Sequence, residues 1–323
     1  MNLEKARATC NTIVGQILSL YVGDEMLIEK ILAATMSNGH VLFEDNPGLG
    51  KTLLAKTLAF SIDCDFSRVQ CTPDLLPADI LGTKVWRLKD GSFKLFKGPV
   101  FTNILLVDEI NRSPPKTQSA VLEVMEERQV TIEGETYMCE EPFFVLATQN
   151  PIEYEGTYPL PEAQIDRFMM KLSTGYPRTI DEEKLIVGRR IAWKKDDPTR
   201  DLKPVISAEE FSALQRVVEN DIYIDDVVIK YIAEIVRKTR EHPQVEVGSS
   251  PRGSLALLKA SRAVALMRGR DFVTPDDIKT LAVDTLAHRL ILRVEDVMKQ
   301  VDERKIVKEI LDTVSVPKDY RPR

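Results

Sequence analysis

Residues 44–52 read EDNPGLGKT, and this stretch decides the fold that we predict for the chain. An apolar segment, residues 40–44 (HVLFE), precedes it, and a segment of helix-forming composition, residues 51–61, follows it. A strand, a tight loop and a helix in this order form half of a βαβ unit. In such a loop, backbone N–H groups point at phosphate oxygens, and the positive end of the following helix attracts the same anion. The stretch therefore predicts a phosphate-binding loop in an α/β domain.

The residue types of this loop suit a nucleoside triphosphate. Glycines allow the backbone to approach the phosphates closely, Lys51 supplies a mobile cation for them, and the Thr52 hydroxyl is a ligand for Mg²⁺. The first glycine of the general pattern GxxxxGK(S/T) is replaced by Asp45, and we expect Asp45 to tolerate the unusual backbone angle that this position often takes. An ordinary Gly/Pro turn is the alternative, but the flanking strand and helix favour the phosphate loop. The predicted nucleotide-binding residues are Asn46, Pro47, Gly48, Leu49, Gly50, Lys51, Thr52 and Leu53.

Two acids follow an apolar run that we interpret as a buried parallel strand. Residues 104–107 (ILLV) precede Asp108 and Glu109. Because parallel strands place their carboxyl ends at one edge of the sheet, we expect both acids to face the phosphate loop. Asp108 is predicted to hold Mg²⁺ through water, and Glu109 to polarise the water that attacks the γ-phosphate. A solvated acidic turn is the alternative.

Three further polar residues are candidates for the same reaction. Asn150 closes the next strand and could orient the attacking water, although Gln-Asn-Pro is by itself a turn signal. Arg167 is a candidate arginine finger for a neighbouring subunit's γ-phosphate, and an internal pair with Asp166 or Glu162 is its alternative. Arg252 lies in the first turn of a predicted helix, where a cation opposes the helix dipole. We therefore expect Arg252 to bind an outside anion such as a nucleotide phosphate, with an ordinary surface arginine as the alternative.

The chain divides into an α/β domain, residues 1–176, and an all-helical domain, residues 177–323, because strand signals stop after Pro177. Short apolar runs predict parallel strands at residues 66–69, 104–107, 143–148 and 168–172. Alternating patterns predict two β-hairpins, residues 83–96 around Asp90-Gly91 and residues 129–139 around Glu133-Gly134.

Apolar residues at helical spacing predict helices at residues 3–37, 51–61, 114–128, 179–193, 225–239 and 286–314. We expect Asn38-Gly39 to end the first of these, since glycine accepts the left-handed conformation. Capping signals predict further helix starts at Ser207-x-x-Glu210, Ser250-Pro251 and Thr274-Pro275. Residues 194–204 are predicted as a polar linker or loop.

Composition limits the class of protein. The 323 residues are 43% hydrophobic and 29% charged, which is typical of a globular chain of about two domains. The net charge of −6 does not favour nucleic acid or anionic lipid as a partner. No apolar run approaches the roughly 20 residues of a membrane span, and the first residues lack the apolar core of a signal peptide. The 4 Cys have no CxxC spacing and the 3 His lie far apart, so we expect a cytoplasmic protein with reduced thiols and no structural zinc site.

These motifs together resemble the MoxR group of AAA+ ATPases, which is related more distantly to the MCM and magnesium-chelatase branches. The resemblance covers nearly the whole chain. It rests on EDNPGLGKT (residues 44–52), CTPDLLPADILGT (residues 71–83), KGPVFTNILLVDEINRSPPKTQSAVLEVMEERQVTIEG (residues 97–134), ATQNPIEYEGTYPLPEAQIDRF (residues 147–168) and SSPRGSLALLKASRA (residues 249–263).

The resemblance implies a P-loop NTPase fold: a three-layer α/β/α domain with a parallel sheet and inserted β-hairpins, followed by an all-α lid domain. It implies Mg²⁺-dependent ATP hydrolysis in a homo-oligomeric ring, usually a hexamer, with sites at subunit interfaces. It also implies chaperone-like remodelling or maturation of protein complexes, often with a partner that carries a von Willebrand factor A domain. The implied roles are Walker A for Lys51 and Thr52, Walker B for Asp108 and Glu109, sensor 1 for Asn150, arginine finger for Arg167, sensor 2 for Arg252, and contact with the adenine for Val22 and Gly23.

Two rival functions stay open at this point. An MCM-like, nucleic-acid-dependent motor should carry basic hairpin tips, because neutralisation of phosphates drives such binding. The hairpin at residues 129–139 has Glu133 and Glu135 but no Lys or Arg, which opposes that function. The hairpin at residues 83–96 favours it slightly, with Lys84, Arg87, Lys89 and Lys94 against Asp90 alone. A small-molecule kinase is disfavoured by the paired hairpins and the helical second domain.

Overall fold

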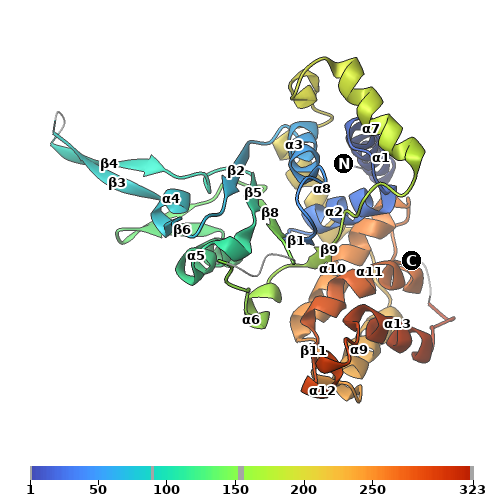
Figure 1. The fold of residues 1–323 in the computed structure, drawn as a ribbon. Coiled ribbons are helices and arrows are strands. Elements are labelled where there is room, and N and C mark those ends of the chain that lie inside the picture. The colour runs from blue at the N-terminus through green and yellow to red at the C-terminus, as the bar shows by residue number, and fades with distance from the viewer. Residues whose placement is uncertain (1, 89–90, 152–155, 321–323) are drawn as a thin grey trace.

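The computed structural model describes residues 2–88, 91–151 and 156–320, and a five-stranded sheet forms the centre of its first half (Figure 1). The strands are β1 (Val41–Glu44), β2 (Phe66–Gln70), β5 (Ile104–Asp108), β8 (Phe144–Gln149) and β9 (Met170–Leu172). They lie in the order β2, β5, β8, β1, β9, and every neighbouring pair is parallel. The carboxyl ends of the strands therefore share one edge of the sheet, as the sequence predicts.

Helices cover both faces of this sheet. Successive strand residues point to opposite faces and accordingly belong to two different hydrophobic clusters. In β5, Ile104 and Leu106 belong to one cluster, whereas Leu105 and Val107 belong to the other. The first cluster includes residues of α1 (Leu3–Leu20), α2 (Glu25–Met36) and α3 (Lys51–Ser61), and the second includes residues of α4 (Pro77–Leu81) and α5 (Pro115–Glu127). A further short helix, α6 (Glu162–Ile165), precedes β9. The predicted three-layer architecture is confirmed.

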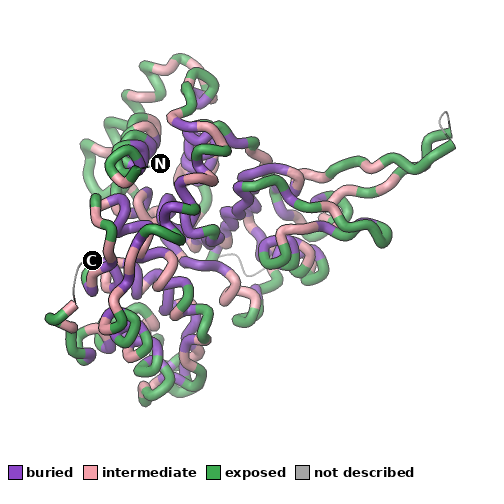
Figure 2. Tube along the Cα trace, turned by 180° about the vertical axis from the view of Figure 1, so that it is seen from behind, coloured by how far each residue is buried: buried purple, intermediate pink, exposed green. Residues whose placement is uncertain are grey.

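Both predicted hairpins are present. The first consists of β3 (Gly82–Arg87) and β4 (Ser92–Lys97), and the second of β6 (Gln129–Ile132) and β7 (Glu135–Met138). The β3–β4 hairpin projects from the body as a long arm, most of which is exposed or half-buried (Figures 1 and 2). Lys89 and Asp90 of its predicted turn lie outside the described residues.

The second half consists mainly of helices. They are α7 (Ile180–Trp193), α8 (Ala208–Asn220), α9 (Asp226–Glu241), α10 (Pro251–Met267), α11 (Pro275–Leu286), α12 (Val294–Met298) and α13 (Glu303–Thr313). The predicted capping box at Ser207 and Glu210 is present, and Ser250 caps α10. Helices α8 to α11 enter the same hydrophobic cluster as α1 to α3. The two predicted domains therefore share one packed core, and the boundary at residue 176 stays a prediction.

The structure corrects three predicted details of secondary structure. The helix predicted at residues 3–37 is two helices, because the chain turns at residues 21–24 and Asp24 caps α2. At its end Asn38, with φ of 56°, takes the left-handed conformation that we expected of glycine. The continuous helix predicted from residue 286 to 314 is wrong, since a 3₁₀ turn, a short strand and α12 interrupt it.

A small antiparallel ribbon modifies the all-helical prediction for residues 177–323. It pairs β10 (Val245–Val247) with β11 (Ile291–Leu292). Within the part of the chain that the structure describes, no helix combines the length and the hydropathy that a membrane span requires.

His40 joins three parts of the first domain from a buried position before β1. Its Nε2 lies 2.9 Å from the carbonyl oxygen of Met125 in α5, and its Nδ1 accepts a hydrogen bond from the Val145 amide in β8 at 2.9 Å. This arrangement requires the neutral ring with its proton on Nε2. Burial lowers the pKa of His40 to about 4.

We expect the free energy of unfolding to fall as the pH decreases from 6.5 towards 4. In this range the unfolded chain binds a proton at His40 that the folded chain does not bind, so acid favours unfolding. The slope contributed by one such group is at most about 1.4 kcal/mol per pH unit. Urea unfolding of the wild type and of His40→Gln at several pH values measures the effect. Equal slopes for the two proteins would contradict it.

Candidate functional site

The loop between β1 and α3 has the shape of an anion-binding cradle. Gly48 and Gly50 adopt φ of 84° and 78°, the left-handed region that favours glycine. A Cβ atom at Gly48 would meet no other atom within 4 Å, so the loop is open on that side. No side chain caps the first turn of α3, and its backbone N–H groups are available to an anion.

Lys51 stands at the start of α3, where the loop holds its ammonium group. Its Nζ donates to the carbonyl oxygen of Asn46 at 2.8 Å and lies 3.4 Å from that of Asp45. Burial lowers the pKa of Lys51, while the nearby carboxylates of Asp45, Asp108 and Glu109 raise it. The cation is thus placed at the loop and close to the acids, as the sequence predicts.

Asp45 does not play the part that the sequence analysis expects. It is not among the described residues with positive φ, so the loop requires no unusual backbone angle at this position. Its buried carboxylate instead accepts hydrogen bonds from Ser173 Oγ at 2.6 Å and from the Thr174 amide at 2.7 Å. Asp45 therefore attaches the phosphate loop to the segment that follows β9.

Asp108 is the last residue of β5, and Glu109 follows it directly. Thr148 of β8 holds them, because its Oγ1 donates to Asp108 Oδ1 at 3.3 Å and accepts from the Glu109 amide at 2.8 Å. Glu109 has φ of 55°, a conformation that is uncommon for residues other than glycine and that occurs often at functional sites.

A small polar cavity of 170 Å³ joins these groups. Thr52 and Asp108 both line it, and their oxygens are the hard ligands that Mg²⁺ prefers. Asn150 lines it from the end of β8. The structure thus brings together the predicted loop, both acids and the predicted sensor. The complete lining is Asp45, Pro47, Gly48, Leu49, Gly50, Lys51, Thr52, Arg68, Gln70, Asp108, Glu109, Thr148, Gln149 and Asn150.

Two arginines that the sequence analysis missed are paired with the acids. Arg68 of β2 donates from Nε to Asp108 Oδ2 at 2.6 Å, and Arg112 donates from Nη1 to Glu109 Oε2 at 3.1 Å. Arg112 lies only three residues after Glu109, a spacing that could have suggested this pair. Nothing local indicates Arg68, because the pairing of β2 with β5 brings it to Asp108.

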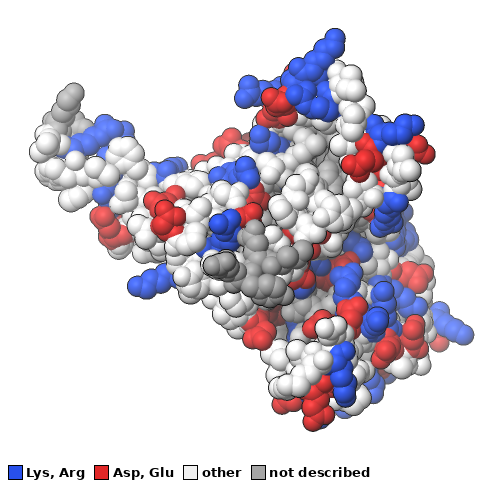
Figure 3. Space-filling view, in the orientation of Figure 1, with Lys and Arg blue, Asp and Glu red and all other residues white. Residues whose placement is uncertain are grey.

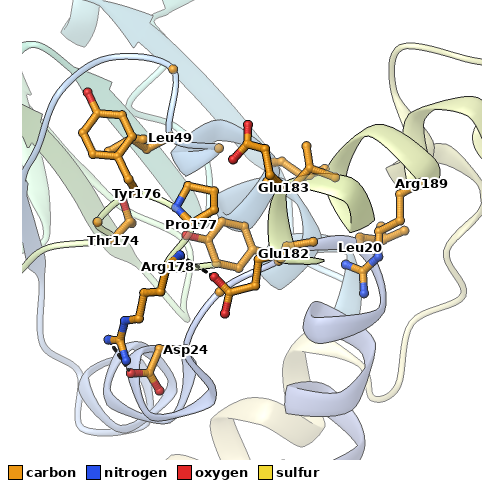
Figure 4. A pocket seen from close by; sticks show the side chains of 18 of the residues that line it. Leu20, Asp24, Leu49, Thr174, Tyr176, Pro177, Arg178, Glu182, Glu183 and Arg189 are labelled. Atoms are coloured by element: carbon orange, nitrogen blue, oxygen red, sulfur yellow. Dashed lines mark hydrogen bonds and ion pairs between the residues drawn. The ribbon is translucent and has the colours of Figure 1, made fainter. Parts of the chain in front are cut away.

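A second, larger cavity of 750 Å³ adjoins the first (Figure 4). Both cavities include the loop residues 47–50, so they meet at the phosphate loop. Val22 and Gly23, the residues predicted beside the adenine, line the larger one. Opposite them, α7 contributes Glu182, Glu183, Ile186, Arg189, Arg190 and Trp193. A nucleotide with its phosphates in the small cavity has room for its base and sugar in the large one.

Arg167 and Arg252 lie elsewhere, and neither lines these two cavities. Both pair with Glu126 at the end of α5, and the Arg167 Nη2 to Glu126 Oε2 distance is 3.1 Å. The alternative from the sequence paired Arg167 with Asp166 or Glu162. Among the described residues, its carboxylate partner is Glu126 instead. Asp166 instead accepts from the buried Arg289 at 2.9 Å.

The arginine pair and the phosphate loop lie at opposite ends of β1. Met125, beside Glu126, bonds to His40 at the amino end of this strand, whereas the loop begins at its carboxyl end. The four residues of β1 span about 13 Å. Arg167 and Arg252 are therefore not brought to the cavities of their own chain, and their predicted contact with a nucleotide stays a prediction.

Comparisons with known proteins agree with this geometry. The family model for ATPases associated with various cellular activities (AAA) matches residues 40–170, and the model for the AAA lid domain matches residues 237–310. The chain is 40% identical over 318 residues to the chaperone MoxR1 of Mycobacterium tuberculosis, covering 96% of this chain and 82% of that protein. It is 50% identical over 304 residues to the uncharacterized protein YeaC of Bacillus subtilis, covering 94% and 93%.

A solved structure is similar over almost the whole length. It is that of a candidate ATPase from Cytophaga hutchinsonii, with a TM-score of 0.90 and 40% sequence identity, and the match covers 98% of this chain and 97% of that chain.

We expect Arg68→Ala to lower the Mg²⁺ concentration at which nucleotide binding is half-maximal, by several-fold. The guanidinium of Arg68 occupies Asp108 Oδ2, so its removal frees a predicted Mg²⁺ ligand. Titration of Mg²⁺ against a fluorescent ATP analogue measures this shift, with Arg87→Ala on the exposed arm as the control. A higher Mg²⁺ requirement in Arg68→Ala would show that Arg68 supports metal binding instead of competing with it.

Proposed function

We propose that this chain, which belongs to the MoxR family of AAA ATPases, couples Mg²⁺-dependent ATP hydrolysis to the remodelling or maturation of protein complexes. One observation carries the proposal: a lysine, a threonine and two carboxylates from separate elements meet at one small cavity beside an open glycine loop. A nucleoside triphosphate needs this combination of cation, hydroxyl and acids.

Different residues of the cavity have different roles in the proposed hydrolysis. Lys51 and the N–H groups of α3 hold the phosphate oxygens, and Thr52 and Asp108 would hold Mg²⁺, which neutralises charge on the phosphates when bound. Glu109 accepts the proton of the attacking water as a general base. Asn150 orients that water from the end of β8.

The attachment of Asp45 supports a coupling between the nucleotide and the second half of the chain. Asp45 bonds to residues 173–174, which lead directly into α7. A shift of the loop on hydrolysis would therefore move this segment. The printed name of the Mycobacterium tuberculosis relative, a chaperone, also supports a remodelling role.

The position of the two arginines supports a ring of identical subunits. Arg167 and Arg252 lie together on Glu126, and neither lines the two cavities beside the phosphate loop of their own chain. We propose that they complete the site of the neighbouring subunit in a homo-oligomeric, hexameric ring. We also propose a cytoplasmic location and a partner with a von Willebrand factor A domain, from the resemblance of the sequence.

The nucleic-acid motor gains no support. The comparisons reported above include no such protein, and one basic residue of the arm, Lys84, is neutralised by Glu135 at 2.6 Å. Figure 3 shows Lys and Arg side chains on the described part of the arm next to uncharged surface. Three of the exposed side chains there are aromatic, namely Trp86, Phe93 and Phe96.

Glu109→Gln should bind ATP but hydrolyse it at least about a hundredfold more slowly, because the general base is lost while the phosphate contacts remain. Lys51→Ala should weaken ATP binding itself. Phosphate release and equilibrium binding separate these two effects. Unchanged turnover in Glu109→Gln would refute the assignment of the base.

The same variant tests the remodelling role. We expect Glu109→Gln with ATP to retain its native protein partners during purification, while Lys51→Ala, the matched control, releases them. Equal recovery of partners with both variants would contradict a link between the nucleotide and partner binding.

Arg167→Ala should bind ATP almost normally but turn it over roughly a thousandfold more slowly, since an arginine finger acts on the transition state. If the site is shared, a mixture of Arg167→Ala and Glu109→Gln subunits should hydrolyse more ATP than the sum of the two alone. A mixture of Arg167→Ala with a chain carrying both substitutions is the control and should stay inactive. No gain in the first mixture would refute the shared site.

A further inference from the structure

The two arginines proposed to act on a neighbouring subunit come from different halves of the chain. Arg167 follows the short helix α6 in the first half, and Arg252 lies in the first turn of α10 in the second half. Both side chains nevertheless reach one carboxylate, that of Glu126. Groups on separate elements act together on one phosphate only if their spacing is held, because a misplacement of about 1 Å can cost about a hundredfold in rate. We therefore searched for contacts that join the two elements.

Asp166 is the residue at which they meet. Its carboxylate accepts hydrogen bonds from Ser250 Oγ at 3.0 Å and from Arg289 Nε at 2.9 Å. Ser250 is also the N-cap of α10, and its Oγ accepts from the Arg252 amide at 3.2 Å. The Arg252 Nε lies 3.9 Å from Asp166 Oδ2. The carboxylate next to Arg167 in the sequence thus binds the cap of the helix turn that carries Arg252.

Arg289 holds the backbone on both sides of Arg167. It belongs to the 3₁₀ turn after α11, and its side chain is only 2% exposed. Its Nη2 donates to the carbonyl oxygens of Asp166 at 3.1 Å and of Phe168 at 2.7 Å. Burial lowers the pKa of Arg289 to about 10, and the nearby Asp166 opposes this shift. A guanidinium with acceptors in several directions has one orientation, so the segment around Arg167 is fixed to the second half of the chain.

The contacts of Asp166 and Arg289 point to a role at a neighbouring site. Neither residue lines the two cavities beside the phosphate loop of its own chain. A buried ion pair is also weak evidence for stability, since the cost of removing two charges from water offsets their attraction. What the pair does determine is where Arg167 and the start of α10 lie relative to each other.

We propose that Asp166 is a positioning residue for the reaction at the neighbouring subunit: through Ser250 and Arg289 it holds Arg167 and Arg252 at the spacing at which both reach the same nucleotide. The inference rests on the proposed shared site. Because Ser250 and Arg289 belong to the second half of the chain, a movement of this half in one subunit changes the pair of arginines that the next subunit receives.

Substitutions at the joint test the proposal. Asp166→Asn should lower kcat for ATP at least about tenfold and leave equilibrium ATP affinity unchanged, because a neutral amide holds Ser250 and Arg289 less firmly. Ser250→Ala should act in the same direction by a smaller factor, about threefold, and Ser250→Thr, which keeps the hydroxyl, should recover most of the turnover. Ser207→Ala is the matched control and should turn over ATP as the wild type does. It removes an equivalent cap, that of α8, where Ser207 Oγ accepts from the Glu210 amide.

Mixed rings give a readout that a loss of folding would not imitate. Asp166→Asn subunits keep the general base, and Glu109→Gln subunits keep well-placed arginines. Their mixture should therefore hydrolyse more ATP than the sum of the two alone, as should a mixture of Ser250→Ala with Glu109→Gln if Asp166→Asn does not fold.

The mixture of Arg167→Ala with Glu109→Gln separates the two ways in which the idea can fail. If that mixture gains activity and the Asp166 and Ser250 mixtures do not, the positioning role is overturned and the shared site stands. Wild-type turnover in Asp166→Asn, or a loss of ATP affinity as large as the loss of kcat, would also overturn the positioning role. No gain in the Arg167→Ala mixture would instead refute the shared site and the inference with it.

Discussion

The buried carboxylate of Asp45 is the interaction on which the arrangement of the site depends. A carboxylate that leaves water needs donors, and here a hydroxyl and an amide of Ser173 and Thr174 provide them. These donors belong to the segment after β9. Their hydrogen bonds to Asp45 therefore join the end of β1 to the end of β9 and to the segment that leads into α7. The attachment borders both cavities, since Asp45 lines the small one and Thr174 lines the large one.

The acids of the site are balanced by cations from the same chain. Asp108 pairs with Arg68 and Glu109 with Arg112, while Lys51 bonds to backbone carbonyl oxygens of the loop. Two like charges so close together repel one another, and the paired guanidinium groups offset that repulsion. The two arginines therefore lie against the same carboxylates at which Mg²⁺ and the attacking water are proposed to bind.

The parts of the structure that the sequence predicts are those with local causes. The helix predicted at residues 51–61 has those bounds, because the glycine before it and the apolar spacing within it are local. The contact of Asp45 with Ser173 joins residues 128 positions apart, and no pattern within either segment indicates it. The helix predicted after residue 286 fails for a similar reason. Arg289 is buried there and donates to Asp166 and to the carbonyl oxygen of Phe168, contacts that end the helix and that only the fold provides.

The strand β1 separates the two arginines from the phosphate loop of the same chain. The strand lies between the phosphate loop at its carboxyl end and Glu126 with the two arginines near its amino end. Its pairing with β8 and β9 fixes it in the sheet. In the proposed assembly, the surface that carries the arginines meets the surface that carries the loop of a second copy in a head-to-tail contact. Repetition of such a contact closes into a ring when the rotation permits. The separation that leaves the single chain without its arginines is thus the physical reason for the proposed assembly.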